Sequence, residues 1–242
     1  GGDGRYGNLK AIDIILKMAA AHGAGKVITT TGGILSTPAA SHLIRKHKAV
    51  GGIILSASHN AGGPKGDFGV KVNGANGGPA SESLTNNIYE KTKELTHFKI
   101  WEGSPININS PRKDFLGGMT IEIINGIDDY LSLMQQIFDF DEIEKLLRNN
   151  FPIVFDALHA VTGPYAKRLL EGLLSAPEGS VKNAVPLSDF GGGHPDPNLT
   201  YAHELSDLLL NSDKYCFGAA CDGDGDRNMI LGRRCFVNPS DS

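Results

Sequence analysis

The sequence predicts an α/β fold with two consecutive domains, each a mixed sheet flanked by helices. The chain has 242 residues, and single domains commonly span about 100–150 residues. Short apolar or β-branched runs alternate with runs of helical periodicity in both halves of the chain, which is typical of the α/β class. Hydrophobic residues make up 40% of the chain and charged residues 21%, as in soluble globular proteins with a packed core. We place the domain boundary near residue 127, which gives segments 1–127 and 128–242.

The first segment opens with a helix and continues with alternating strands and helices. Residues 9–22 carry apolar side chains at helical spacing, and Gly23 ends this helix. Thr37 before Pro38 predicts the cap and first turn of the next helix, which runs to about residue 48. The other expected elements are a strand at 26–31, strands at 52–57 and 68–73, a helix at 81–95 and an irregular stretch at 97–119.

The second segment restarts this alternation. Residues 121–140 are expected to be helical in their second part, and Asp141 is expected to cap a further short helix. The other expected elements are a strand at 152–156, a turn at 159–163, helices at 164–174 and 203–211, a strand at 217–221 and a hairpin at 228–237. The order of elements therefore predicts the same fold class for both segments.

Composition excludes several classes of function. The net charge is −4 and the pI is about 6.1, so we expect no nucleic-acid partner, because such proteins present a basic face. No run reaches the ~20 apolar residues of a membrane span, so we expect no membrane partner. The three cysteines, at 216, 221 and 235, fit no metal-binding spacing and indicate a reducing compartment, the cytoplasm. The chain starts with neither methionine nor a signal peptide, so we expect it to begin inside a longer protein.

A serine loop at residues 58–67 follows the apolar strand predicted at 52–57. Ligands in open α/β sheets bind at the carboxyl ends of strands, which is where Ser58 lies. His59 comes next, and Gly62 and Gly63 would let the backbone approach a bulky anion. Serine needs a base or prior activation to act as a nucleophile. The alternative is a plain turn built from turn-forming residues, and the loop lacks the spacing of an esterase nucleophile elbow.

An aspartate loop at residues 222–227 indicates function more specifically than the serine loop does. Asp222, Asp224 and Asp226 alternate with two glycines directly after a predicted strand, and alternation in extended chain brings every second side chain to one side. Clustered carboxylates repel one another unless a cation lies among them, and oxygen ligands suit Mg²⁺ or Ca²⁺. An EF-hand would need glycine and glutamate where Arg227 and Arg233 stand, so Mg²⁺ fits better. The alternative is a solvated acidic hairpin turn.

The interpretation of each loop supports that of the other. A phosphorylated Ser58 would carry about −1.5 to −2 charges at neutral pH, which is tolerable beside three aspartates only with a divalent cation between them. Arg227 would then hold phosphate with its forked donors. We therefore predict that the serine loop and the aspartate loop form one site.

These motifs resemble the α-D-phosphohexomutase superfamily, and specifically its phosphoglucomutase branch. The resemblance spans essentially the whole chain. It is carried by GGDGRY (1–6), GILSTPA (33–39), ILSASHNAGGPKGDFGVKVN (54–73), IFDF (137–140), FDALHAVTGPY (155–165), HPDPNLTYA (194–202), CDGDGDRNMILG (221–232) and FVNPSDS (236–242). It implies the first two of the four domains of that family, with the phosphoserine loop in 1–127 and the metal-binding loop in 128–242.

The resemblance also implies roles for individual residues. Ser58 corresponds to the phosphoserine, and a phosphoserine oxygen joins the three aspartates as a Mg²⁺ ligand. The candidates for proton transfer are His59 and Lys71, and the candidates for contacts to substrate or phosphate are Arg5 and Arg227. The implied activity is that of an isomerase that transfers phosphate within a hexose phosphate. It interconverts glucose 1-phosphate and glucose 6-phosphate through a bound glucose 1,6-bisphosphate.

The length of the chain limits the activity that the resemblance implies, and two other functions remain open. With domains III and IV absent, we expect this chain to bind metal without efficient turnover, as a monomer, with a weak dimer as the alternative. One competing reading is an aspartyl-phosphate phosphatase with Asp222 as nucleophile and Asp224 as acid/base. The other is a non-catalytic phosphoprotein of the same fold that resembles parafusin.

Overall fold

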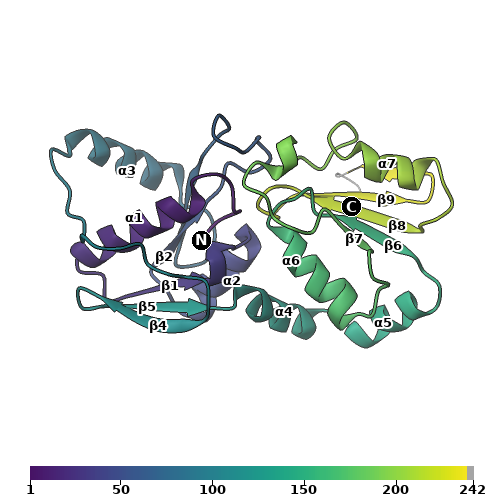
Figure 1. The fold of residues 1–242 in the computed structure, drawn as a ribbon, viewed down its shortest axis with the longest axis horizontal. Coiled ribbons are helices and arrows are strands. Elements are labelled where there is room, and N and C mark those ends of the chain that lie inside the picture. The colour runs from purple at the N-terminus through teal and green to yellow at the C-terminus, as the bar shows by residue number, and fades with distance from the viewer. Residues whose placement is uncertain (239–242) are drawn as a thin grey trace.

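The computed structural model describes residues 1–238, which form two α/β halves lying side by side (Figure 1). The first half runs to the end of β5 and the second starts with α4. The predicted fold class is confirmed: each half has sheets flanked by helices. The last four residues of the 236–242 segment lie outside the described residues.

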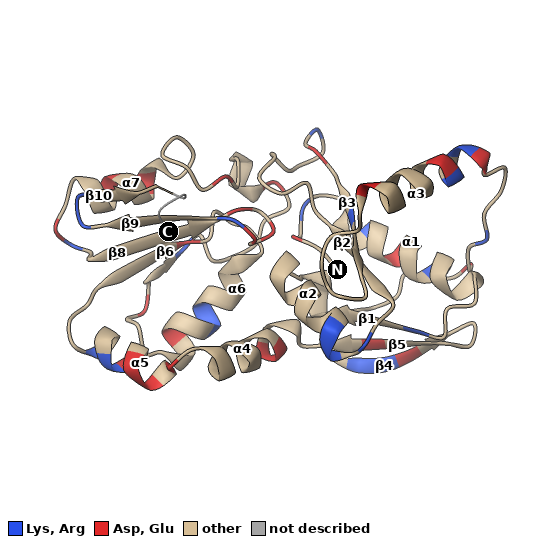
Figure 2. Cartoon of the chain, turned by 180° about the vertical axis from the view of Figure 1, so that it is seen from behind, with Lys and Arg blue, Asp and Glu red and all other residues tan. Residues whose placement is uncertain are grey.

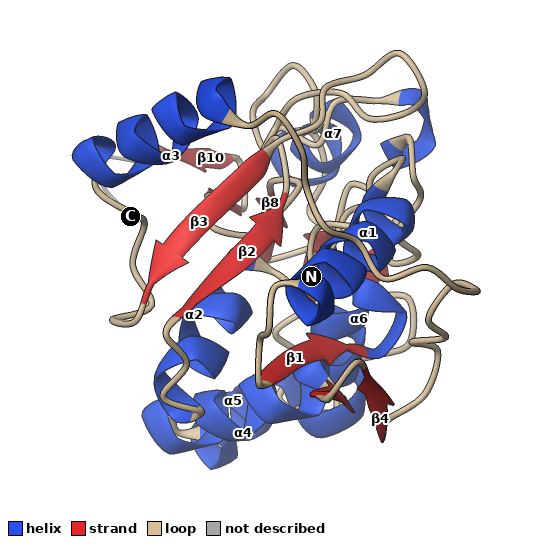
Figure 3. Ribbon diagram, turned by 90° about the vertical axis from the view of Figure 1, so that its left-hand side faces the viewer, coloured by secondary structure: helices blue, strands red, loops and turns tan. Residues whose placement is uncertain are grey.

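The first half contains two small sheets. The three-stranded sheet has the order β1-β5-β4, with β1 parallel and β4 antiparallel to β5. Strands β2 and β3 form a separate antiparallel pair, which stands apart from β1 in Figure 3. The elements are α1 (Asn8–Ala21), β1 (Lys26–Thr30), α2 (Thr37–Lys46), β2 (Gly51–Leu55), β3 (Val70–Gly74), α3 (Glu82–Glu94), β4 (Arg112–Leu116) and β5 (Met119–Ile124), with a 3₁₀ turn at Thr31–Gly33.

The second half is built on one mixed sheet of five strands, in the order β10-β9-β8-β6-β7. Strand β6 is parallel to both β7 and β8, whereas β9 runs antiparallel to both β8 and β10. The elements are α4 (Gly126–Ile137), α5 (Phe140–Arg148), β6 (Ile153–Asp156), α6 (Thr162–Ala166) continued by a π-helix (Lys167–Leu173), β7 (Val181–Lys182), a 3₁₀ turn (Phe190–Gly192), α7 (His203–Leu210), β8 (Phe217–Cys221), β9 (Asn228–Gly232) and β10 (Cys235–Val237).

Each half buries its own apolar core. In the first half, Ile12 and Leu16 on one face of α1 pack against Ile121 of β5 and Leu55 of β2. In the second half, α7 covers the sheet from one side, and its side chains pack on Val154, Met229 and Leu231 of the strands. Burying such side chains contributes about 1.5–3 kcal/mol each, so these contacts hold the strand ends from which the two loops emerge.

Two helix caps correct the sequence predictions. Ser36, not Thr37, caps α2: its backbone is extended and its hydroxyl accepts a hydrogen bond from the Ala39 N–H at 3.3 Å. Asp139, not Asp141, caps α5 through the Glu142 N–H. In both cases the predicted residue already has helical conformation one or two positions inside the helix. Thr37 is thereby available for a different contact, described below.

Three stretches differ from the expected elements. Residues 112–124 form the hairpin β4–β5, where the prediction had irregular chain up to residue 119 and no strand after it. Side chains of β5 alternate between buried and half-buried positions, which is the period of a strand with one buried face. The helix expected at 164–174 begins at Thr162, and its second part is π-helical. The short strand β7 was not predicted.

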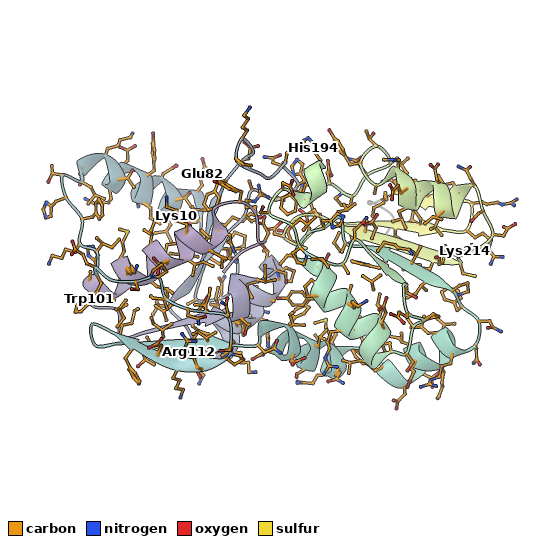
Figure 4. All side chains as sticks on the ribbon, in the orientation of Figure 1. Lys10, Glu82, Trp101, Arg112, His194 and Lys214 are labelled. Carbon is orange, nitrogen blue, oxygen red and sulfur yellow. The ribbon has the colours of Figure 1, made fainter. Side chains whose placement is uncertain are left out.

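The two halves meet along α2 and α4 and again at the loops that leave β2 and β8. The rings of His42 on α2 and Tyr130 on α4 pack edge to face, and His42 also pairs with Asp129 across the same contact. The predicted boundary at residue 127 falls within the first turn of α4. Figure 4 shows Trp101 and Lys214 at opposite outer edges, whereas His194 lies on a loop nearer the junction.

Surface helices carry charges of both signs. Figure 2 shows acidic and basic residues along α3 and α5, where ion pairs such as Lys93–Glu90 and Arg148–Glu144 connect successive turns. Among residues 1–238, no helix has the length and apolar character that crossing a bilayer requires.

Candidate functional site

The serine loop leaves the carboxyl end of β2 and returns to the sheet as β3. Ser58 itself has a positive φ of 54°, an uncommon conformation for a residue with a side chain. The Ser58 N–H donates to the Ser56 hydroxyl at 2.8 Å, which holds this turn. Strained backbone of this kind concentrates at functional sites, so the loop has the features of a constrained nucleophile turn.

The aspartate loop joins β8 to β9 and is held by one of its own carboxylates. Oδ1 of Asp222 accepts hydrogen bonds from the N–H groups of Gly225, Asp226 and Arg227, each at 3.1 Å. Gly225 has a φ of 78°, and a Cβ there would lie 2.7 Å from Cγ2 of Thr162. Glycine is therefore required at this position for both backbone conformation and space.

The two loops are in direct contact, as predicted. The Ser58 hydroxyl donates to Oδ2 of Asp222 at 2.8 Å, and a Cβ on Gly223 would lie 2.3 Å from the Ser58 carbonyl oxygen. Asp222 and Asp224 are fully buried, whereas Asp226 is exposed. The three carboxylates and the Ser58 hydroxyl thus form one cluster.

Cationic side chains lie next to this carboxylate cluster. Lys71, on β3, lies 2.6 Å from Asp224 and 3.7 Å from Asp226. Arg227 pairs with Asp222 at 3.2 Å, and its terminal nitrogen also contacts the Ser58 hydroxyl and Nδ1 of His59. The structure therefore brings together seven of the eight predicted site residues: Ser58, His59, Lys71, Asp222, Asp224, Asp226 and Arg227.

The two buried aspartates differ in pKa. Burial raises the pKa of Asp222, and the neighbouring Asp224 charge raises it further. For Asp224, burial alone would raise the pKa, but hydrogen bonds from Lys71 and Thr37 outweigh it and lower the pKa. Neighbouring carboxylates whose pKa values shift in opposite directions are typical of functional sites, where burial and nearby charges perturb the pKa.

The carboxylates fit a hard divalent cation. Asp222, Asp224 and Asp226 each offer one oxygen, and these atoms lie within 4.8 Å of one another. Oδ1 of Asp224 is buried and has no hydrogen-bond partner among residues 1–238. An unpaired buried carboxylate oxygen costs free energy, and a bound cation would remove that cost. The all-oxygen donor set is the one that Mg²⁺ prefers.

Arg5 lies behind the serine loop, and its predicted contact with substrate or phosphate stays a prediction. Its side chain is 1% exposed and its guanidinium donates to Asp3, to the Asp67 carbonyl at 2.7 Å and to the Ser58 carbonyl at 3.0 Å. Arg5 thus holds the backbone of the serine loop from behind.

Two further details were not predicted. Thr37 donates a short hydrogen bond to Asp224 through its hydroxyl, and its N–H donates to the Asp224 carbonyl at 2.8 Å. The Ser-Thr-Pro start of α2 was the available signal, but it indicates a cap rather than a site residue. Gly62 faces the second half and not the carboxylate cluster, since a Cβ there would lie 2.8 Å from the Ser188 carbonyl oxygen. This glycine therefore allows close contact between the two halves.

Comparison with known proteins places both halves in one family. The family model described as phosphoglucomutase/phosphomannomutase, alpha/beta/alpha domain I, matches residues 1–99. The model for alpha/beta/alpha domain II of the same family matches residues 128–234. The two matches together cover most of the chain, and each includes one of the two loops.

Individual relatives agree with this assignment. Phosphoglucomutases of Rhizobium radiobacter and Schizosaccharomyces pombe are each 53% identical over all of this chain, which covers 45% and 44% of their lengths. The crystal structure of the exocytosis-sensitive phosphoprotein pp63/parafusin, a phosphoglucomutase from Paramecium, superimposes with a TM-score of 0.94 at 44% identity. That match covers 99% of this chain and 46% of the other. The chain thus spans a little under half the length of these relatives, and it belongs to the phosphoglucomutase/phosphomannomutase family.

Proposed function

We propose that Ser58 carries a phosphoryl group beside a Mg²⁺ ion in a phosphoglucomutase that interconverts glucose 1-phosphate and glucose 6-phosphate. The observation that carries this proposal is the 2.8 Å contact between the Ser58 hydroxyl and Asp222, at the edge of the carboxylate cluster. A phosphate on Ser58 would stand against three acidic side chains, an arrangement that is stable only with a divalent cation.

Asp222, Asp224 and Asp226 would hold this ion, with a phosphoserine oxygen as a further ligand. When bound, Mg²⁺ would withdraw charge from the phosphoryl oxygens and so lower the barrier to phosphoryl transfer. The unpaired Oδ1 of Asp224 supports the assignment, because a buried carboxylate oxygen without a partner is unfavourable in the metal-free chain.

The transfer itself would exchange one phosphorus–oxygen bond for another. The bond between phosphorus and the Ser58 oxygen breaks while the bond to the free hydroxyl of the sugar phosphate forms, which gives glucose 1,6-bisphosphate. Arg227 is placed to stabilise the phosphoryl oxygens, since its guanidinium already contacts the Ser58 hydroxyl. The proton of the attacking hydroxyl would pass to a nearby base, and His59 and Lys71 are the candidates for this proton transfer. In the return step the other phosphate goes back to Ser58 and the same base acts as acid.

The aspartyl-phosphate alternative is disfavoured by the surroundings of Asp222. Its Oδ1 accepts three backbone N–H groups, and its Oδ2 accepts from Ser58 and Arg227. A carboxylate engaged at both oxygens is a poor nucleophile. The parafusin-like alternative shares the same fold and would share the same site, so only the activity of the complete protein distinguishes it.

The proposal extends to the organisation of the protein. We infer that segments 1–127 and 128–242 are two domains, that hexose phosphate is the substrate class, and that the chain is monomeric, with a weak dimer as the alternative. A cytoplasmic location is proposed from the cysteine pattern. Because the chain spans less than half of its relatives, we expect it to accept phosphate and bind metal but to turn over glucose 1-phosphate poorly.

Intact-mass measurement tests the carrier role. The chain is incubated with glucose 1,6-bisphosphate and Mg²⁺, and the mass of one added phosphate is measured before and after acid and hydroxylamine treatment. We expect one acid-stable, hydroxylamine-resistant phosphate that is absent from Ser58→Ala. A hydroxylamine-labile phosphate retained in Ser58→Ala would instead support the aspartyl-phosphate function.

A further inference from the structure

A turn of the second half reaches across to the serine loop. It comprises Ser188, Asp189 and Phe190, on the loop between β7 and α7. The Ser188 carbonyl accepts hydrogen bonds from two N–H groups of the first half, those of Tyr6 at 2.8 Å and Gly63 at 3.0 Å. One residue of this turn therefore makes backbone contacts with both the N-terminal segment and the serine loop.

Phe190 is the buried member of this turn. It is 3% exposed, and its ring lies 5.2 Å from the Arg5 guanidinium carbon, in a cation–π arrangement. Its φ is 53°, which is unfavourable for a bulky side chain. Glycine would adopt this backbone conformation at lower cost, so the ring is placed here in spite of an unfavourable backbone.

The ring completes the restraint on Arg5. The edge of the guanidinium is held by Asp3 at 2.9 Å and by the carbonyls of Asp67 and Ser58. These hydrogen bonds fix the group within its own plane and leave its flat face without a restraint. Phe190 packs on that face, so donors and ring together hold the guanidinium in three dimensions.

Gly62 gives the turn room to approach. A Cβ on Gly62 would lie 2.8 Å from the Ser188 carbonyl oxygen and 2.9 Å from Cε2 of Phe190. Close packing of the two halves at this point thus depends on the absence of a side chain. The contact lies on the serine loop, four positions after Ser58.

We propose that the 188–190 turn clamps the serine loop against the second half, with Phe190 as the positioning residue that holds Arg5 and, through it, the Ser58 carbonyl. The role as a clamp follows from these contacts alone. Its consequence for Ser58 rests on the proposed function, because the clamp would fix the distance between the phosphate carrier and the aspartate loop.

Hydrogen exchange followed by NMR on the full chain tests the clamp. The variant is Phe190→Leu, which keeps an apolar side chain and removes the ring. We expect the N–H groups of Tyr6 and Gly63 and the Arg5 Nε–H to exchange about 10-fold faster, and the Arg5 Nε–H resonance to shift because the ring current is lost. Phe190→Tyr should restore slow exchange. The control is Tyr215→Leu, a buried ring in the core of the second half, which should leave these three groups unchanged.

Unchanged exchange at all three groups in Phe190→Leu would overturn the clamp. If that variant does not fold, Gly62→Ala decides, since its added Cβ pushes on the same turn: faster exchange at Tyr6 and Arg5 supports the clamp, and unchanged exchange overturns it. A separate readout is the rate at which Ser58 takes phosphate from glucose 1,6-bisphosphate, expected to fall in Phe190→Leu and to recover in Phe190→Tyr. An unchanged rate despite faster exchange would overturn the positioning role, whereas no uptake by the wild type would reject the carrier role and leave the exchange result standing.

Discussion

The Ser58 hydroxyl lies 2.8 Å from Oδ2 of Asp222, although 164 residues separate the two in the chain. The contact joins the loop that ends β2 in the first half to the loop that ends β8 in the second. A Cβ on Gly223 would lie 2.3 Å from the Ser58 carbonyl oxygen, so the backbones of the two loops also touch. The predicted pairing of a serine loop with an aspartate loop is therefore a single site, and several predictions depend on it.

Asp224→Asn should weaken Mg²⁺ binding strongly. Loss of an outer-shell partner commonly costs 10–100-fold in metal affinity, so loss of a direct ligand should cost at least about 100-fold. Isothermal titration of the metal-free chain with Mg²⁺ measures this. Asp213→Asn, which removes an exposed carboxylate paired with Arg234, is the control and should titrate like the wild type. Equal affinity in both variants would place the metal elsewhere.

Lys71→Met should strengthen Mg²⁺ binding. The Lys71 ammonium lies 2.6 Å from Asp224 and competes with a metal for the same carboxylate. A partly exposed ion pair is worth roughly 1 kcal/mol, so the affinity should rise about 5-fold, while the metal-free variant should melt at a lower temperature. Lys65→Met, on the exposed part of the serine loop, is the matched control. Weaker Mg²⁺ binding in Lys71→Met would show that the lysine supports the metal site instead of competing with it.

Gly225→Ala should lower the free energy of unfolding by more than the cost of placing a side chain in left-handed backbone. A side chain in left-handed backbone costs roughly 1–2 kcal/mol, and overpacking against Thr162 should add about 1–3 kcal/mol. Gly23→Ala is the matched control, because Gly23 has a similar φ of 81° and no atom of residues 1–238 lies within 4 Å of an added Cβ. Denaturant unfolding compares the two free energies, and Mg²⁺ titration should be impaired in Gly225→Ala only. Equal destabilisation would mean that the loop has space for the methyl group.

Glu171→Gln should destabilise the second half in a pH-dependent way. Burial alone would raise the pKa of Glu171, but the Val181 N–H, Lys167 and the Gly179 N–H lower it overall. Its carboxylate accepts both N–H groups at 3.0 Å, and hydrogen bonds to charged groups contribute about 1.5–3 kcal/mol.

The sign of this pH dependence follows from the lowered pKa. The stabilisation is fully present above the unfolded value of about 4.3 and is lost as the pH falls through the lower folded value. Urea unfolding at pH 7 should show the variant about 1–3 kcal/mol less stable, with the difference shrinking below pH ~4. A difference that stays constant down to acidic pH would contradict the charge-dependent role.

Much of the fold followed from sequence periodicity because most elements bury one continuous apolar face. Helix α1 and strands β8 and β9 show this. Strand β5 was missed although its side chains alternate as in a half-buried strand. Strand β4 was not predicted, because it is partly exposed and charged and has little apolar signal of its own. Pairing with β5 and packing of β5 on α1 stabilise it, and such long-range contacts are not visible in a local window.

The candidate site was predictable to the extent that its chemistry is local. Three aspartates alternating with glycines indicate a metal ligand set, and a serine at a strand end indicates a nucleophile. The burial of Arg5 could not be predicted, because it depends on Asp3, on the serine-loop carbonyls and on Phe190 from the other half. The contact of Thr37 with Asp224 likewise arises only when the two halves meet.

The central claim is that Ser58 and the three aspartates share one metal ion. Anomalous diffraction from crystals of the Ser58-phosphorylated chain soaked in Mn²⁺ measures this directly. We predict one strong peak within coordinating distance of Asp222, Asp224, Asp226 and a phosphoserine oxygen. A peak at another place, or no peak at this cluster with Ser58 fully phosphorylated, would contradict the account.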